Sequence, residues 1–197
     1  MSSSMNLPQS SNPCPLSTRG FSLIELLVVI AIAGILLAIG VPNLQGFIAS
    51  NRVSSSANEF LTALQQARSE ATRRGATAIL RSRGTAGSGD FGAGWDLFFD
   101  ADNDNTIDAG EVVRSGGPVG GQMTLRGSTG AFGTDIRFDG AGRLNAAGLV
   151  VLCFNGALND SRALILDRNG RVRAAVLNSS RVPLDESGTA LTTCTPA

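Results

Sequence analysis

The sequence predicts an α+β protein in which a long amino-terminal helix, transmembrane at first and amphipathic further on, precedes an antiparallel all-β head. Two observations lead to this prediction. Residues 21–41 form an apolar run with a single charge, and apolar residues then recur at spacings of three and four to about residue 74. Beyond that point the chain is rich in glycine and its apolar residues fall in short runs, a pattern typical of strands joined by tight turns.

The apolar run from Phe21 to Val41 is long enough to cross a membrane. At about 1.5 Å per residue, a helix over this run reaches roughly 31 Å, which matches the hydrocarbon core of a bilayer. Arg19 precedes the run and no basic residue follows it before Arg52, so the positive-inside bias orients the amino terminus toward the cytoplasm. No small-residue cleavage pattern follows the run, which disfavours its removal as an ordinary secretory signal.

Glu25 is the single charged residue of this run. A carboxylate inside a span costs about 2.5 kcal/mol or more near the bilayer centre and less near an end, so such acids usually have a partner or a purpose. The alternative is that Glu25 lies at the level of the lipid headgroups and is merely tolerated there. The position of the residue alone leaves both interpretations open.

The residues around Glu25 resemble a known leader. The string RGFSLIELLVVIAIAGILLAIGVP, which begins at Arg19, resembles the class III leader of type IV pilins and type II secretion pseudopilins. The resemblance implies that a prepilin peptidase removes residues 1–20 by cutting between Gly20 and Phe21, and that it methylates the new amino group of Phe21. It also implies that Glu25 pairs with the amino terminus of a neighbouring subunit in a filament, which would neutralise the acid.

The helix is predicted to continue over residues 42–75 as an amphipathic segment. Pro42 matches the proline at which such helices commonly loosen or kink, because proline lacks an N–H and clashes with the preceding turn. Gly75 is predicted to cap the helix at its carboxyl end. The apolar stripe of this segment is predicted to pack on the head rather than on a partner helix, and it consists of Leu44, Phe47, Ile48, Ala57, Phe60, Leu61, Leu64, Ala67 and Ala71.

The head is predicted to span residues 76–197 and to consist of short strands. The predicted strands cover residues 76–80, 95–99, 111–114, 122–126, 135–138, 149–154, 163–167 and 171–177. A long amino-terminal helix with an all-β head resembles the GspH/FimT branch of minor pilins and pseudopilins, so the resemblance implies a pilin-like fold. Beyond the leader, it rests on the segment at Trp95, the turn Phe138-Asp139-Gly140 and the motif Gly170-Arg171-Val172-Arg173.

Charge and composition exclude several classes of function. The chain has 16 basic residues, all of them arginine, 16 acidic residues and no histidine. Cleavage after Gly20 would remove Arg19 and leave a net charge of −1, which does not by itself favour nucleic acid. Without histidine or lysine, a Ser/His or Cys/His nucleophilic site and a lysine base are excluded. Carboxylate chemistry stays open on paper, yet the one dense acidic cluster has metal-loop spacing, so we expect no catalytic residues.

Cysteine usage predicts a disulfide bond. The resemblance implies that Cys14 leaves with the leader, so Cys153 and Cys194 remain as a pair in an oxidising compartment, where disulfide formation is the expected outcome. The alternative is two unrelated buried thiols. A disulfide would tie the polar tail, residues 178–197, to the head, and closing a loop of about 40 residues would stabilise the fold by roughly 3 to 4 kcal/mol.

An arginine-rich hairpin is predicted near the carboxyl end. Asn169-Gly170 favours a two-residue type I′ turn, which would pair Arg168 with Arg171 and Leu166 with Arg173. Three arginines would then share one face: Arg168, Arg171 and Arg173. The opposite face is predicted to point to the core and carries Ile165, Val172, Ala174 and Val176. The planar fork of arginine matches phosphate geometry, whereas the alternative interpretation is a solvated hairpin tip.

The same hairpin carries the predicted function. Gly170-Arg171-Val172-Arg173 matches the Gly-Arg-x-Arg motif with which FimT-like minor pilins bind DNA for uptake in natural transformation. The resemblance implies this role for Arg171 and Arg173, and Arg168 and Arg181 are added by proximity. Contacts would be to phosphates and independent of sequence, and three of them give a slope of log K against log salt of roughly −2.7. Many copies along a fibre would strengthen such weak binding.

An acidic loop is the candidate metal site. Acids at positions one, three, five, nine and twelve, with Ile107 at position eight, match the calcium-loop spacing. The candidate ligands are Asp100, Asp102, Asp104, Thr106, Asp108 and Glu111. Two departures are Asn105 in place of the usual glycine and a strand, not a helix, leading into the loop. The alternative is an Asx-rich surface hairpin without metal.

The sequence therefore predicts a non-enzymatic filament subunit with no small-molecule substrate. Its expected partners are other pilins or pseudopilins, the prepilin peptidase, the inner membrane and DNA. Its expected place is the inner membrane as a single-pass protein with the head in the periplasm, and later a pilus or pseudopilus. An alternative function implied by the resemblance is that of an H-type minor pseudopilin, a structural component at the tip of a type II secretion pseudopilus.

Overall fold

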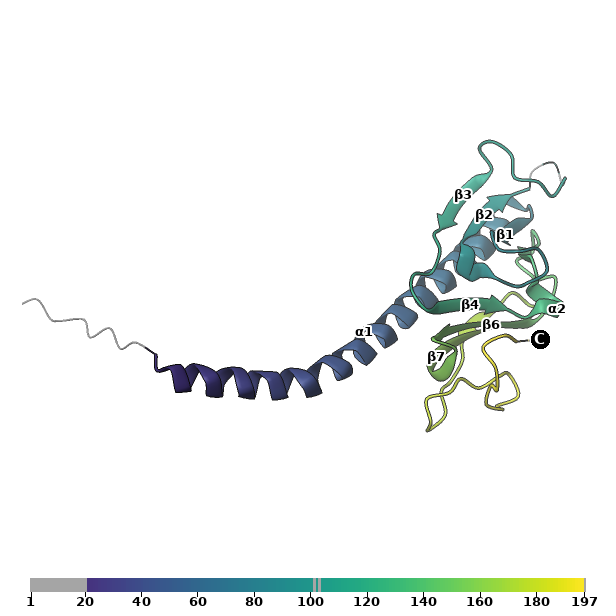
Figure 1. Cartoon of the computed structure of the whole chain (residues 1–197). Coiled ribbons are helices and arrows are strands. Elements are labelled where there is room, and N and C mark those ends of the chain that lie inside the picture. The colour runs from purple at the N-terminus through teal and green to yellow at the C-terminus, as the bar shows by residue number, and fades with distance from the viewer. Residues whose placement is uncertain (1–20, 101, 103, 197) are drawn as a thin grey trace, which may run out of the picture. The chain divides into compact units, whose positions relative to one another are not determined.

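The computed structural model describes residues 21–100, 102 and 104–196, and Figure 1 shows its elements. In chain order these are α1 (Leu23–Arg74), β1 (Ala78–Ser82), η1 (Phe91–Ala93), β2 (Trp95–Phe99), β3 (Val112–Gly116), β4 (Met123–Gly127), α2 (Thr129–Phe132), β5 (Asp135–Phe138), β6 (Gly148–Phe154), β7 (Ala157–Leu166) and β8 (Val172–Ala174). The described residues up to Asn43 and those from Leu44 onward form two compact units. The predicted leader, residues 1–20, lies outside the described residues.

The first part of α1 has the length and composition of a membrane span. Its segment Leu23–Gly40 is apolar over 18 residues, and no residue of it is buried in the single chain. The helix is assigned without interruption from Leu23 to Arg74, so Pro42 does not end it. Proline at this place removes one backbone hydrogen bond, which a long helix can tolerate.

From Val53 onward, one face of α1 is buried in the head. The buried residues recur at spacings of three and four and are Val53, Ala57, Phe60, Leu64, Ala67 and Ala71, with Ala63 buried beside them. The predicted stripe is therefore correct only in its second half. Its first members, Leu44, Phe47 and Ile48, are exposed, because the head covers α1 only from Val53.

Gly75 ends α1 as the sequence predicts. Its φ is +64°, a left-handed conformation that glycine adopts without steric cost. The N–H of Ala76 donates to the carbonyl oxygen of Ala71 at 3.2 Å, which is the long hydrogen bond of a Schellman cap. The chain then turns into β1, so the cap sets where the head begins.

Two four-stranded antiparallel sheets build the head. The first sheet has the order β3-β2-β1-β5 and the second the order β4-β6-β7-β8. Figure 1 shows β4, β6 and β7 side by side in the second sheet. Most strands lie close to the predicted ranges, although β1 begins two residues later and β8 ends three residues earlier. The largest departure is β7, which begins six residues before the predicted start at residue 163. The short helices η1 and α2 were not predicted, since three or four residues are too few to show a period.

Aromatic rings join α1 to the first sheet. The ring of Phe60 meets the rings of Phe91 and Trp95 edge-on, with centroids 5.5 Å and 5.9 Å away. All three side chains are buried in one core cluster. Edge-to-face pairs of this kind contribute about 0.5 to 1.5 kcal/mol each beyond their buried area, so they help to fix the helix on β2.

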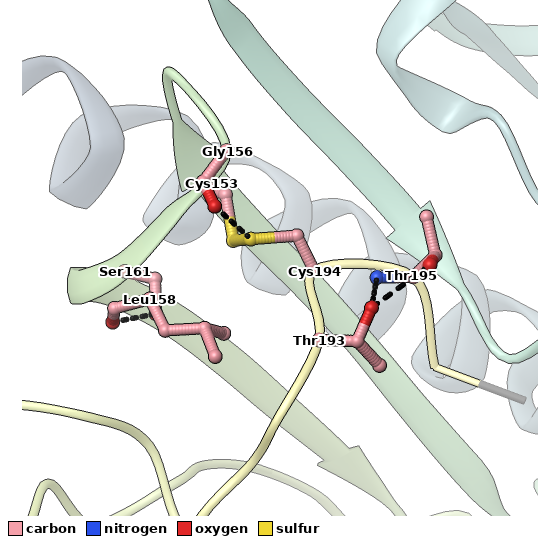
Figure 2. The surroundings of a disulfide bond; sticks show 7 residues. All are labelled: Cys153, Gly156, Leu158, Ser161, Thr193, Cys194 and Thr195. Carbon is pink, nitrogen blue, oxygen red and sulfur yellow. Dashed lines mark hydrogen bonds between the residues drawn. A yellow bond between two sulfur atoms is a disulfide. The ribbon is translucent and has the colours of Figure 1, made fainter.

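The carboxyl-terminal tail is tied to the second sheet by the predicted disulfide. Cys153 of β6 and Cys194 are joined with an S–S distance of 2.02 Å and a Cα–Cα distance of 6.1 Å, as Figure 2 shows. This confirms the pairing and excludes two unrelated thiols. Cys153 is buried in a small cluster with Val151 and Ala163, against which Leu191 of the tail also packs. The tail is therefore held by apolar contacts as well as by the bond.

Candidate functional site

The arginine hairpin closes with a three-residue turn, so the predicted type I′ turn is wrong. Leu166 pairs with Val172 across β7 and β8, and the N–H of Gly170 donates to the carbonyl oxygen of Asp167 at 2.9 Å. Gly170 has φ +79° and Asn169 does not have a positive φ, whereas a type I′ turn requires both. A Cβ at position 170 would collide with the carbonyl oxygen of Gly142. The observed turn therefore places the backbone of Gly170 directly against that of Gly142.

The changed register moves the core residues of the hairpin. Ile165 pairs with Arg173 and therefore shares its face, instead of lying opposite as predicted. Val172 packs against the core, but Ala174 and Val176 are exposed, and the prediction that they face the core is wrong. The cause is the extra residue in the turn, which shifts every pairing by one.

Two of the four predicted DNA-binding arginines keep their common face. Arg171 and Arg173 are two residues apart in an extended segment and so point the same way. Arg168 lies in the turn and is exposed, rather than opposite Arg171. Arg181 lies outside the hairpin and forms an ion pair with Asp160, at 2.5 Å between Nη2 and Oδ1. Its charge is thus already balanced within the chain.

A helix residue that sequence reasoning missed completes the site. An open pocket of about 440 Å³ is lined by Gln65, Arg68, Ser69 and Thr72 of α1 and by Gly170, Arg171 and Val172 of the hairpin. Arg68 Nη2 also donates to the carbonyl oxygen of Asn169 at 3.2 Å. The four helix residues recur at spacings of three and four, so they share one face, but nothing in the sequence shows which hairpin that face meets.

The chemistry of this pocket favours an anion. Arg68 and Arg171 supply two guanidinium groups, each a planar donor that carries a fixed positive charge. The hydroxyl protons of Ser69 and Thr72 are donated to carbonyl oxygens within α1. The guanidinium groups and the side-chain amide of Gln65 are therefore the donors that remain for a ligand such as a phosphate.

The arginines of the hairpin differ from most others in lacking an acidic partner. Elsewhere in the head, guanidinium groups pair with carboxylates, as Arg83 does with Asp96. In the part of the chain that the structure describes, no ion pair joins a carboxylate to Arg68, Arg168, Arg171 or Arg173, and Asp167 beside them takes part in none. Like charges held together without counter-charge repel, so this cluster is poised for an anionic partner.

The acidic loop joins β2 to β3 and brings its carboxylates together. Two overlapping groups have ligand oxygens within 4.8 Å of one another, and they comprise Asp100, Asp102 and Asp104 in one and Asp102, Asp108 and Glu111 in the other. Thr106 belongs to neither group, and its hydroxyl donates to Asp104. The negative charge of Asp104, together with partial burial and the charge of Glu111, raises the pKa of Asp108. The predicted ligand set is thus assembled in space, apart from the threonine side chain.

The assembly residues lie at the amino end of α1. Phe21 and Glu25 are exposed, and Glu25 stands in the first turn of the helix without an ion pair among the described residues. Gly20, on the other side of the predicted cut, lies outside the described residues. The cleavage site and the pairing of Glu25 stay predictions.

Solved structures share this fold. Two crystal forms of the type IV minor pilin FimU of Pseudomonas aeruginosa superpose with TM-scores of 0.57 and 0.51, at 23% and 20% identity. The superpositions cover 75% and 72% of this chain and 98% of the FimU chain. At this identity the likeness concerns the fold, and it confirms the predicted pilin-like arrangement of an apolar helix followed by antiparallel sheets.

Sequence comparisons identify the family. The type IV major fimbrial protein FimA of Dichelobacter nodosus is 38% identical over 79 residues, which are 39% of this chain and 51% of that protein. The match thus spans about half the length of the relative. A model for the prokaryotic N-terminal methylation motif matches residues 16–41, and one for the type II transport protein GspH matches residues 56–170, more than half of the chain. The chain therefore belongs to the GspH family of minor type IV pilins and pseudopilins.

Proposed function

We propose that this protein is a minor subunit of a type IV pilus that binds DNA for uptake in natural transformation. The observation that carries the proposal is the arginine cluster of the hairpin, which has no acidic partner in the described chain although the molecule pairs most of its other head arginines. Arg171 and Arg173 would contact the phosphate backbone, and Arg168 would lie within reach at the turn. Arg181 is set aside because Asp160 already balances it.

The pocket between α1 and the hairpin supports contact with phosphates rather than with bases. It is open, and its charged donors are guanidinium groups, which bind phosphate oxygens in fork geometry. Arg68 adds a fourth cation that the sequence motif does not include. Contacts of this kind carry no base sequence, and their number sets the salt dependence of binding.

Assembly through α1 is the second part of the proposal. The prepilin peptidase would cut between Gly20 and Phe21 and methylate Phe21, and the matched methylation motif supports this step. The apolar side chains of Leu23–Gly40 are exposed in the single chain and require cover. Lipid of the inner membrane would cover them first, with the head in the periplasm, and neighbouring helices would cover them in the filament. Glu25 would then pair with the amino group of Phe21 of the next subunit.

A second candidate is a minor pseudopilin of the type II secretion system. The family model that matches residues 56–170 is described as a type II transport protein, which favours this alternative. Such a subunit would use the same helix and fold, and its head would contact other minor subunits at the tip of the pseudopilus. The two candidates differ in whether the hairpin arginines bind DNA.

A mobility-shift titration of the full mature chain in detergent, with double-stranded DNA of random sequence, separates the candidates. We expect wild-type protein to bind at low salt, Arg171→Ala plus Arg173→Ala to weaken binding at least about tenfold, and Arg68→Ala to weaken it less. Each phosphate-contacting arginine that is removed should reduce the salt slope by about 0.9. The slope falls because each substitution removes one positive charge that neutralises a phosphate.

The matched control is Arg52→Ala plus Arg162→Ala, which removes the same charge from arginines that also lack an ion pair among the described residues. This variant should bind DNA nearly as wild type does. Absence of wild-type binding at low salt would remove the DNA proposal and leave the secretion subunit. Equal losses in the two double variants would show a general charge effect and would also contradict a site at the hairpin.

A further inference from the structure

The loop between β2 and β3 contains a buried carboxylate oxygen without a partner. Asp100 is only 4% exposed, and its Oδ1 forms no hydrogen bond within the described residues. The other oxygen, Oδ2, accepts from the backbone N–H of Asn105 at 3.2 Å. A buried carboxylate oxygen that lacks a donor costs free energy, so native structures nearly always supply a proton donor or a cation.

The carboxyl group of Asp100 lies close to other carboxylates. Asp100 shares its cluster with Asp102 and Asp104, and Asp102 connects it to Asp108 and Glu111. Five acids within one twelve-residue loop repel one another in the absence of a counter-charge. A single divalent cation would both coordinate the unpartnered oxygen and reduce the repulsion among the carboxylates.

Two arginines of the first sheet bind the loop at Asn105. Asn105 has φ +61°, at the sixth position where calcium loops normally need glycine for a sharp turn. Arg81 Nη1 donates to the carbonyl oxygen of Asn105 at 2.8 Å, and Arg137 donates to its side-chain oxygen. Both arginines are themselves anchored on Asp135. These arginines therefore hydrogen-bond to Asn105, and neither donates to Asp100 Oδ1.

We propose that five described carboxylates of this loop form a calcium site. The carboxylates of Asp100, Asp102, Asp104, Asp108 and Glu111 are the ligands, and the backbone carbonyl of Thr106, at position seven, completes the set by its place in the loop. All donors are oxygens, which suits hard cations. The number of carboxylates favours Ca²⁺, which takes six to eight ligands, over Mg²⁺, which demands near-ideal octahedral geometry.

The site would strengthen the edge of the first sheet. β3 is the outer strand of that sheet, and this loop joins it to β2, the strand with which it pairs. Most ligands are exposed, so we expect an affinity in the range of extracellular modules, with a Kd of about 10⁻⁴ to 10⁻³ M. Bound calcium would then raise the thermal stability of the head at millimolar concentration.

Isothermal titration of the full mature chain in detergent with CaCl₂ tests the site directly. We expect one Ca²⁺ per chain, and a thermal midpoint that rises with Ca²⁺ and falls again with EGTA. Glu111→Gln and Asp100→Asn should each weaken binding about tenfold or more, because each removes a charged ligand from the set. Circular dichroism before titration shows that each variant is folded, and the exposed Asp108→Asn replaces Asp100→Asn if the buried change impairs folding.

The matched control is Glu59→Gln, which removes one exposed acid from α1 and should leave calcium binding unchanged. Lack of Ca²⁺ binding to wild type at 5 to 10 times the upper end of the expected Kd, about 10⁻³ M, would overturn the proposal. An equal midpoint shift with MgCl₂ at the same ionic strength would overturn it too, since that result indicates charge screening. Unchanged binding by the loop variants would place the ion elsewhere and equally defeat the assignment.

Discussion

The two charged turns of the head differ in the sign of their charge and in the contacts that the rest of the head makes with them. In the basic turn, residues 168–173, three arginines stand together and the chain that the structure describes offers them no ion pair. In the acidic loop between β2 and β3, Arg81 donates to the backbone carbonyl of Asn105 and Arg137 to its side-chain oxygen, while the carboxylates face one another. The comparison shows that the molecule pairs most of its other head arginines with acids, whereas each of these two turns concentrates charge of one sign. A concentrated charge that the fold does not balance indicates a ligand of the opposite sign.

The two turns also differ in which residue adopts the left-handed backbone conformation. The basic turn uses Gly170, whose missing side chain lets Gly142 approach. The acidic loop uses Asn105, whose side chain is itself bound by Arg137. One turn therefore depends on the absence of a side chain and the other on the presence of one. Substitutions at these positions and at their anchors test the comparison.

The largest effect is expected for Gly170→Ala. A non-glycine residue in the left-handed region costs about 1 to 2 kcal/mol, and the added Cβ would also collide with the carbonyl oxygen of Gly142. We expect a loss of about 3 kcal/mol or more in the free energy of unfolding, measured by denaturant titration with circular dichroism. DNA binding through the hairpin should fall as well, because the turn must move.

Gly156→Ala is the control for backbone strain alone. Gly156 has φ +68°, close to that of Gly170, but nothing lies within 4 Å of the position of its Cβ. This variant should lose only the cost of the left-handed backbone, about 1 to 2 kcal/mol. Equal losses in the two variants would mean that the close approach of Gly142 contributes nothing to the turn.

A smaller effect is expected for Asp135→Asn, which loosens the anchor of the acidic loop. Asp135 accepts from Arg81 at 2.8 Å and 3.0 Å and from Arg137 at 2.6 Å. Burial raises the pKa of its carboxyl, but the hydrogen bonds and charges of the two arginines outweigh burial and hold the pKa below its usual range. The charged form is thus favoured in the folded state, and we expect the variant to lose about 2 kcal/mol at pH 7.

The pH dependence of this loss has a definite sign. Because the folded pKa lies below the unfolded value of about 3.9, the contribution of Asp135 is fully present above that value and is lost as the pH falls through the folded pKa. The difference in unfolding free energy between wild type and Asp135→Asn should therefore be constant near neutral pH and shrink below about pH 4. Glu70→Gln, which removes an exposed helix pair, should show a much smaller difference throughout. A loss that persists unchanged in acid would contradict a role of the charge.

Much of the fold was predictable because it depends on local patterns. The apolar span, the cap at Gly75, the strand positions and the Cys153–Cys194 bond each follow from periodicity, a turn residue or cysteine parity. The short helices escaped prediction because they have no period of their own. The exposed start of the helix stripe, at Leu44, escaped because the sequence does not show where the head begins to cover the helix.

The sequence predicted which residues belong to the candidate sites, but not which residues they contact. The motif at Arg171 and Arg173 is visible in the sequence, yet Asn169-Gly170 favours the wrong turn, since the approach of Gly142 from a distant segment decides it. Arg68 could not be found, because its role depends on tertiary packing of α1 beside the hairpin. The spacing of the acidic loop gave its ligands, whereas the orphan oxygen of Asp100 required the structure.

The smallest effect on stability is expected at Asn105, where two substitutions separate the role of the side chain from that of the left-handed backbone. Asn105→Gly removes the hydrogen bond to Arg137 but relieves the left-handed backbone, whereas Asn105→Ala removes the same bond and keeps a Cβ at φ +61°. We therefore expect the alanine variant to be less stable than the glycine variant by about 1 kcal/mol. Denaturant unfolding of both variants measures this difference directly. If the two variants are equally stable, the backbone at Asn105 is not confined to the left-handed region, and the acidic loop does not hold the sharp turn on which the calcium site depends.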